Sequence, residues 1–202
     1  MSEPTPEYPE KPRKRRVAPV VVGVVAAVLL LAVASAVPVL VGDSDTGGSE
    51  SAGSLVGVEK FELGTPKHAE GKVGYGQVPP VGGHHNPVWL ECGRYAEPVR
   101  DELAVHNLEH GTVWITHRPD LSDQDVARLV DALPADGIIS PYAGLPTPVV
   151  VTVWGIQLQL DGADDPRLAL FLNEYGDGAS APEAEASCAG GVGNPVAEPL
   201  TA

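Results

Sequence analysis

Positive charge is scarce over most of this chain. The 202 residues include 13 Lys and Arg against 27 Asp and Glu, a formal net charge of −14. Five of the basic and three of the acidic residues lie within the first 16 positions, so the remainder carries a formal charge of −16. A surface of this sign repels nucleic acids and anionic lipid headgroups, which argues against binding to DNA, RNA or a membrane surface. It favours solubility and attracts cations.

Cysteine is also scarce, and several catalytic motifs are missing. The two cysteines do not form a Cys-x-x-Cys motif, which argues against dithiol redox chemistry. Ser140 and Ser187 lack the Gly-x-Ser-x-Gly context of a serine hydrolase. No glycine-rich phosphate motif surrounds Gly82-Gly83. Aromatic residues make up only 5% of the chain, so its three tryptophans are expected mainly in the core.

The N-terminal region has the pattern of a membrane anchor. A basic run at residues 11–16 precedes residues 17–41, which contain no charged side chain. At about 1.5 Å per residue, such a helix can cross a hydrocarbon core of roughly 30 Å. The basic flank predicts a cytoplasmic arm at residues 1–16, a single transmembrane helix at 17–41 and export of everything that follows.

A cleavable signal peptide is the alternative interpretation of this region. Ala34-Ser35-Ala36 has the small-x-small form of a cleavage site. The uncharged run is longer than the roughly 7 to 15 residues typical of a signal sequence, which favours a retained anchor. No cysteine follows the run directly, which argues against a lipoprotein. Both interpretations place the rest of the chain outside the membrane.

The exported part divides by composition. Residues 42–57 are typical of a flexible linker, residues 58–189 of one globular domain, and residues 190–202 of a disordered tail. Within the domain, strands are predicted at 113–116, 138–139, 149–154 and 156–160, the last with one face buried. Helices are predicted to follow Ser122 and Asp165, which have capping signals. This order predicts an α+β domain with two to three helices on one face of a mainly antiparallel sheet.

The two cysteines, Cys92 and Cys188, both lie in the exported part. Outside the cytosol a pair of thiols is expected to be oxidised. We therefore predict a structural disulfide that fixes the C-terminal segment to the histidine-rich region.

Five of the six histidines fall within about 45 residues, at His68, His84-His85, His106 and His110. If residues 101–110 form a helix ended by Gly111, then His106, Glu109 and His110 share one face. If they form a strand, His106 and His110 share a face and Glu109 points away. Either geometry allows both histidines to bind one metal ion.

The string His106-x-x-Glu109-His110 also fits that of the inverted zinc peptidases, in which both histidines bind zinc and the glutamate is the base. Three fixed positions arise often by chance, and a β-prone run follows Gly111 directly. Peptidase activity is therefore not favoured.

A wider resemblance covers residues 58–183. Four strings resemble successive motifs of the bacterial family called domain of unknown function 3105: Val78-Pro79-Pro80-Val81-Gly82-Gly83-His84-His85, Cys92-Gly93-Arg94-Tyr95, Val105-His106-Asn107-Leu108-Glu109-His110-Gly111 and Arg118-Pro119-Asp120-Leu121. Members are typically exported or membrane-anchored, and no activity is established for the family. The resemblance singles out His68, His85, His106, Glu109 and His110. His84 matches a variable position, and His117 stands where the family has tyrosine.

Spacing and resemblance together predict a site for a divalent metal ion such as zinc or copper. The predicted ligands are His68, His85, His106 and His110, with Glu109 as a further candidate. Three alternatives stay open: histidines that only shape the fold, a metal-dependent hydrolase with Glu109 as base, and a metal-free scaffold that binds another envelope protein. The sequence identifies neither a substrate nor a protein partner.

Overall fold

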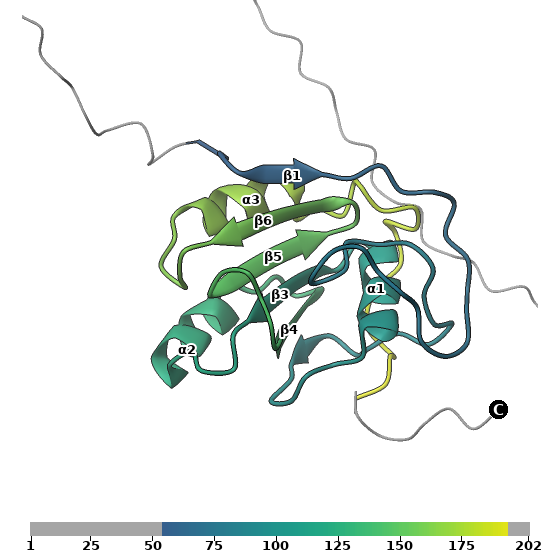
Figure 1. The fold of residues 1–202 in the computed structure, drawn as a ribbon, viewed down its shortest axis with the longest axis horizontal. Coiled ribbons are helices and arrows are strands. Elements are labelled where there is room, and N and C mark those ends of the chain that lie inside the picture. The colour runs from purple at the N-terminus through teal and green to yellow at the C-terminus, as the bar shows by residue number, and fades with distance from the viewer. Residues whose placement is uncertain (1–53, 194–202) are drawn as a thin grey trace, which may run out of the picture. The chain divides into compact units, whose positions relative to one another are not determined.

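The computed structural model describes residues 54–193, which form one sheet with helices on both faces (Figure 1). The helices are α1 (Asp101–Glu109), α2 (Asp123–Ala132) and α3 (Arg167–Tyr175). The strands are β1 (Val58–Lys60), β2 (Gly93–Arg94), β3 (Val113–His117), β4 (Gly137–Pro141), β5 (Val149–Val153) and β6 (Ile156–Leu160).

The six strands lie in the order β1-β6-β5-β3-β4-β2. The pairs β1–β6, β6–β5 and β5–β3 are antiparallel, whereas β3–β4 and β4–β2 are parallel. Helix α2 lies between β3 and β4 in the chain, as a parallel pair requires a crossover. The predicted α+β class with a mainly antiparallel sheet is confirmed.

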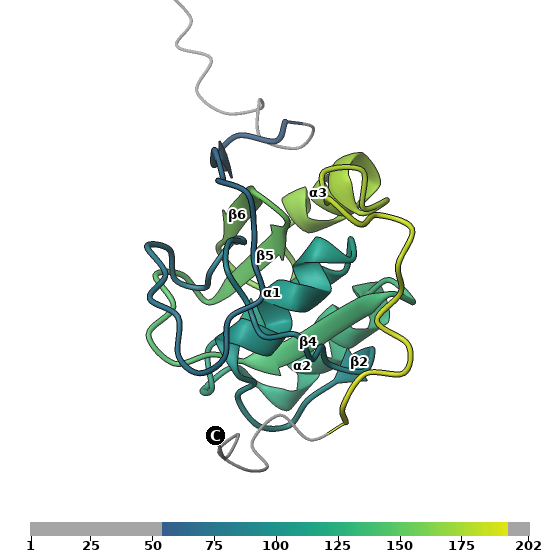
Figure 2. The same ribbon diagram turned by 90° about the vertical axis from the view of Figure 1, so that its right-hand side faces the viewer.

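The sheet is covered on both faces, so the prediction of helices on a single face was wrong. Val113 and Ile115 of β3 pack in one core with α2 and α3, whereas Trp114 between them packs in a second core with α1. An irregular segment, residues 61–92, completes the second layer. It runs alongside α1 in Figure 2.

Strand β6 was predicted to be half-buried, but both of its faces are covered. Gln157, expected toward solvent, is only 4% exposed. Its Nε2 donates to the carbonyl of Pro79 and to Oγ1 of Thr152. The polar–apolar alternation of β6 therefore reflects a hydrogen-bonded polar residue in the core, not exposure of one face of the strand to solvent.

The predicted start of α2 is confirmed, whereas α3 begins at Arg167, one residue later than predicted, with Pro166 at the N-cap position. Ser122 caps α2, because its Oγ accepts from the backbone N–H of Asp125 at 3.2 Å. Asp165 accepts from the backbone N–H of Arg167 at 3.0 Å, and Gly176 follows the last residue of α3. Residues 101–109 form a helix, which decides between the two geometries considered for them.

The folded part extends past the boundaries suggested by composition. Arg167 binds the carbonyl of Val56, and Val192 pairs with residues on either side of Leu90. None of the helices described within residues 54–193 has the length and hydropathy of a membrane-spanning segment. The predicted cytoplasmic arm and transmembrane helix at 1–41 lie outside the described residues, as do most of the predicted linker and tail.

The predicted disulfide is confirmed. Cys92 and Cys188 are bonded, with their Cα atoms 5.1 Å apart and a sequence separation of 96. In the chain-entropy account, closing a loop of this length stabilises the fold by about 4 to 5 kcal/mol.

Candidate metal centre

Helix α1 supplies two side chains to the histidine-rich site. His106 and Glu109 are three residues apart and therefore lie on the same face of the helix. Asp101 and Glu102 in the first turn complement the positive end of the helix dipole. After His110 the chain turns at Gly111, whose φ of 87° is unfavourable for other residues. The helix thus holds both groups on a rigid, buried support.

The irregular segment supplies His68 and His85. Gly82 and Gly83 have φ values of 142° and 113°, and a Cβ atom at Gly82 would collide with the side chain of Leu63. This glycine pair leads the chain to His85. The backbone around His85 then pairs with that around His68, through Ala69 N–H to His85 O at 2.7 Å. The two histidines therefore lie on adjacent extended segments.

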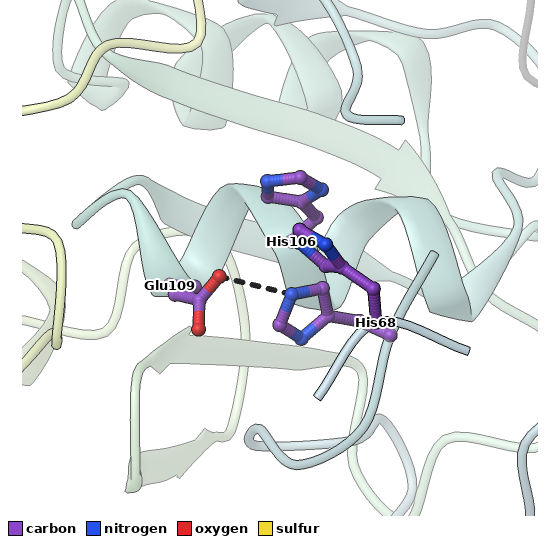
Figure 3. A group of neighbouring side chains, drawn as sticks. His68, His106 and Glu109 are labelled. Atoms are coloured by element: carbon purple, nitrogen blue, oxygen red, sulfur yellow. Dashed lines mark ion pairs between the residues drawn. The ribbon is translucent and has the colours of Figure 1, made fainter. Parts of the chain in front are cut away.

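His68, His85, His106 and Glu109 form one cluster, which we call the histidine centre (Figure 3). Each offers one nitrogen or oxygen atom, and these atoms all lie within 4.8 Å of one another. His85 Nε2 lies 2.9 Å from Oε2 of Glu109. His85 is 1% exposed, His106 4% and Glu109 7%, whereas His68 is exposed to solvent. The centre is therefore buried except on the side of His68.

Backbone carbonyls fix the tautomers of the two buried histidines. Nδ1 of His106 lies 2.7 Å from the carbonyl of Asn86, and Nδ1 of His85 lies 2.9 Å from that of Gly83. A carbonyl oxygen only accepts, so each Nδ1 donates. In the neutral rings Nε2 then carries the lone pair. This is the usual orientation of metal-binding histidines, whose other nitrogen donates to a carbonyl or carboxylate.

His106 is held in its neutral form. Burial lowers the pKa of His106 from 6.5 to about 4, an effect that the hydrogen bond to Asn86 opposes and that His110, His85 and His68 reinforce. Its lone pair is therefore available at neutral pH.

The contact between His85 and Glu109 requires a shared cation. When Nδ1 of a neutral His85 donates to Gly83, Nε2 is an acceptor, and so is the carboxylate that faces it. Nε2 is buried and has no hydrogen-bond partner, although Glu109 is 2.9 Å away. Two acceptors at this distance are satisfied by a proton on His85 or by a metal ion bound to both. The donor set of three imidazoles and one carboxylate suits a transition metal.

His110 lies beside the histidine centre but outside it. Its ring packs against those of His106 and Trp89, with centroids 4.6 and 5.3 Å away. Its Nε2 is 3.7 Å from Oε2 of Glu183, and its buried Nδ1 has no partner. Of the four histidines predicted as ligands, the structure thus brings three together and adds Glu109.

This arrangement differs from that of the inverted zinc peptidases. There both histidines of the string bind zinc and the glutamate is free to act as base. Here Glu109 belongs to the cluster and contacts His85, while His110 faces Glu183. His84 is exposed, and His117 on β3 bonds the carbonyl of Arg118. Neither belongs to the histidine centre.

Sequence reasoning missed three residues that support the site. Asn86 positions His106, as described, and Trp89 packs on His106 and His110. Asn107 ties α1 to the irregular segment, because its side-chain amide bonds both the N–H and the carbonyl of Leu90 at 2.8 and 2.7 Å. Asn107 lies inside the most specific motif of the family, and that position was the one sequence signal that could have identified it.

Comparison with known families agrees with the motif resemblance. The family described as "Protein of unknown function (DUF3105)" matches residues 67–190, more than half of the chain. The match includes the histidine centre and both cysteines. No curated protein and no solved structure matches the chain. The chain therefore belongs to the DUF3105 family.

Proposed function

We propose that this protein binds one divalent transition metal ion, zinc or copper, through His68, His85, His106 and Glu109. The observation that carries the proposal is the convergence of three imidazoles and one carboxylate, two of the imidazoles with Nδ1 already bonded to a carbonyl. Imidazole suits both metals, and a carboxylate oxygen is a common fourth ligand of zinc.

The surroundings of Glu109 support a bound cation at this position. Among the described residues, the ion pair of Glu109 is with His85, and no lysine or arginine contacts it. A buried carboxylate is costly unless a cation compensates its charge. A divalent ion would compensate it and satisfy the unpartnered Nε2 of His85 together. No reaction is assigned to the site, because a metal-dependent hydrolase would need Glu109 as a base rather than as a ligand.

A zinc titration tests the proposal. We expect the metal-free protein to bind one zinc ion per chain, measured by calorimetry at pH 7. His106→Ala removes a ligand and should weaken binding at least tenfold. His84→Ala is the matched control, because His84 is the exposed neighbour of His85 and should leave the affinity unchanged. Equal affinities of the wild type and His106→Ala would refute the assigned ligands.

We further propose that the domain is held outside the cell membrane by a helix at residues 17–41, with the N-terminus in the cytoplasm. The basic run and uncharged segment support this topology, and a disulfide is compatible with an oxidising compartment. Reporter fusions measure it directly. A β-lactamase fused after residue 193 should protect cells against ampicillin, whereas one fused before residue 17 should not. Protection by the N-terminal fusion alone would overturn the topology.

A further inference from the structure

The C-terminal segment, residues 177–193, crosses the molecule beside the histidine centre. It follows α3 and is the yellow segment of Figure 2, where it passes the end of α1 and continues toward β2. We call it the strap. The strap contacts the site-bearing part of the molecule at two places, and the disulfide lies between them.

The first contact is at the end of α1. The backbone N–H of Glu183 donates to the carbonyl of Glu109 at 3.0 Å, and the Glu183 carboxylate faces His110 at 3.7 Å. Gly111 and Gly178 pass so closely that a Cβ atom at Gly111 would lie 3.1 Å from the Cα of Gly178. The strap therefore fixes the turn of backbone that carries the carboxylate of the histidine centre.

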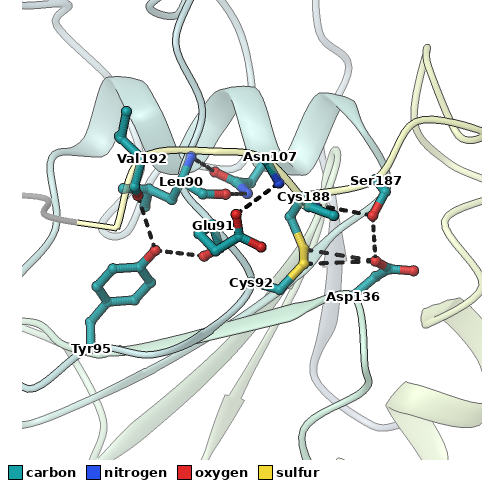
Figure 4. Close-up of a disulfide and its surroundings, with 11 residues drawn as sticks. Leu90, Glu91, Cys92, Tyr95, Asn107, Asp136, Ser187, Cys188 and Val192 are labelled. Carbon is teal, nitrogen blue, oxygen red and sulfur yellow. Dashed lines mark hydrogen bonds between the residues drawn. A yellow bond between two sulfur atoms is a disulfide. The ribbon is translucent and has the colours of Figure 1, made fainter.

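The second contact is with the segment around Leu90 (Figure 4). Val192 donates to the carbonyl of Trp89 at 2.9 Å and accepts from the N–H of Glu91 at 3.1 Å. This pairing holds the backbone of Trp89, whose ring packs on His106 and His110. A Cβ atom at Gly191 would collide with the backbone of Leu90, so only glycine fits at this position.

The Cys92–Cys188 disulfide joins the strap covalently to the same segment. Cys188 is fully buried in the strap, four positions before Val192, and Cys92 follows Glu91. Most of the strap between the two contacts is exposed, and two long-range hydrogen bonds hold it beside the disulfide. Ser187 Oγ donates to Oδ1 of Asp136 at 2.8 Å, and the N–H of Gly190 donates to Oε2 of Glu91 at 2.7 Å. The disulfide is the covalent restraint on a segment that contacts the backbone of both Glu109 and Trp89.

We propose that the Cys92–Cys188 disulfide controls metal affinity at the histidine centre, an inference that rests on the proposed metal-binding function. With the disulfide formed, the strap holds Glu109 and Trp89 in place and the ion is bound tightly. An external dithiol transfers two electrons and two protons to the disulfide, which gives two thiols, and is itself oxidised to a disulfide. The strap then separates from α1, the ligands lose their alignment and the ion is released.

Zinc affinity of two variants tests the inference. Cys92→Ser with Cys188→Ser mimics the reduced state and removes thiols that would bind zinc themselves. Gly191→Ala leaves the disulfide intact but displaces the end of the strap. We expect each to raise the Kd for zinc about 10- to 100-fold, the range typical of lost outer-shell support. Gly193→Ala is the control, because a Cβ atom there meets no atom within 4 Å.

The outcomes separate the two proposals. A folded double-serine variant, checked by circular dichroism, with the zinc affinity of the wild type would overturn the inference and leave the metal site standing. If that variant does not fold, wild-type affinity in Gly191→Ala overturns it equally. Failure of the oxidised wild type to bind zinc would instead refute the metal site itself.

Discussion

Among single side chains, His106 shows how burial prepares a histidine to bind a metal. It is 4% exposed, its Nδ1 donates to the carbonyl of Asn86, and His68, His85 and His110 lie near its ring. Each of these features except the hydrogen bond disfavours the imidazolium form. The neutral ring keeps its lone pair down to acidic pH.

This environment predicts a pH dependence of stability in the metal-free protein. The pKa of His106 is about 4 in the folded state and 6.5 ordinarily, so between these values only the unfolded chain takes up the proton. The free energy of unfolding should therefore fall as the pH is lowered from about 6.5 to about 4, by at most about 3 kcal/mol from this residue.

Urea unfolding at pH 7 and pH 4.5 measures the effect, with His106→Gln as the comparison. Carboxylates contribute equally to both proteins, so the wild type should lose about 2 kcal/mol more than the variant over this interval. An equal loss in both would show that His106 is not held neutral by its surroundings.

The helices and strands differ in how far their sequences predict them. Helix α2 was predicted because Ser122 and the buried positions Val126 and Leu129 are local signals. Strands β1 and β2 are only three and two residues long. They form by pairing with β6 and β4, which are distant in sequence, so no local pattern predicts them.

The same distinction applies to the site. Helical spacing placed His106 with both Glu109 and His110, but it could not decide which of them faces His85. The outcome depends on Glu183 in the strap, which contacts His110, and on the glycine pair that brings in His85. These contacts are distant in sequence and leave no periodic signal.

Helix α3 carries a testable cap. Asp165 accepts from the backbone N–H of Arg167 and pairs with its guanidinium at 2.6 Å. The Arg167 guanidinium, together with backbone N–H groups, lowers the pKa of Asp165 to about 2. Asp165→Ala should lower the free energy of unfolding at pH 7 by about 1 to 2 kcal/mol.

Exposed Asp164 provides the control, because its replacement by alanine should change stability by no more than about 0.5 kcal/mol. Thermal unfolding of the two variants compares them directly. Since the pKa is lowered, the contribution of Asp165 is present above about pH 4 and is lost as the pH falls toward 2. Similar stabilities of the two variants at pH 7 would contradict the capping role.

In the folded domain, the histidine centre lies where segments distant in sequence contact one another. One face of the sheet packs on α2 and α3, and the other packs on α1 and the irregular segment. The histidine centre lies in this second layer, with the strap bonded to the backbone of Glu109 and the side of His68 open to solvent. The acidic surface around the domain favours the approach of a cation.

X-ray absorption spectroscopy of the zinc-loaded protein measures the ligands of the bound ion. We predict one zinc ion per chain, with three imidazole nitrogens and one carboxylate oxygen at about 2.0 to 2.2 Å. Replacing Glu109 by glutamine should alter the oxygen contribution and leave the imidazole signals. A spectrum with sulfur ligands, or with fewer than three imidazoles, would contradict the histidine centre as the metal site.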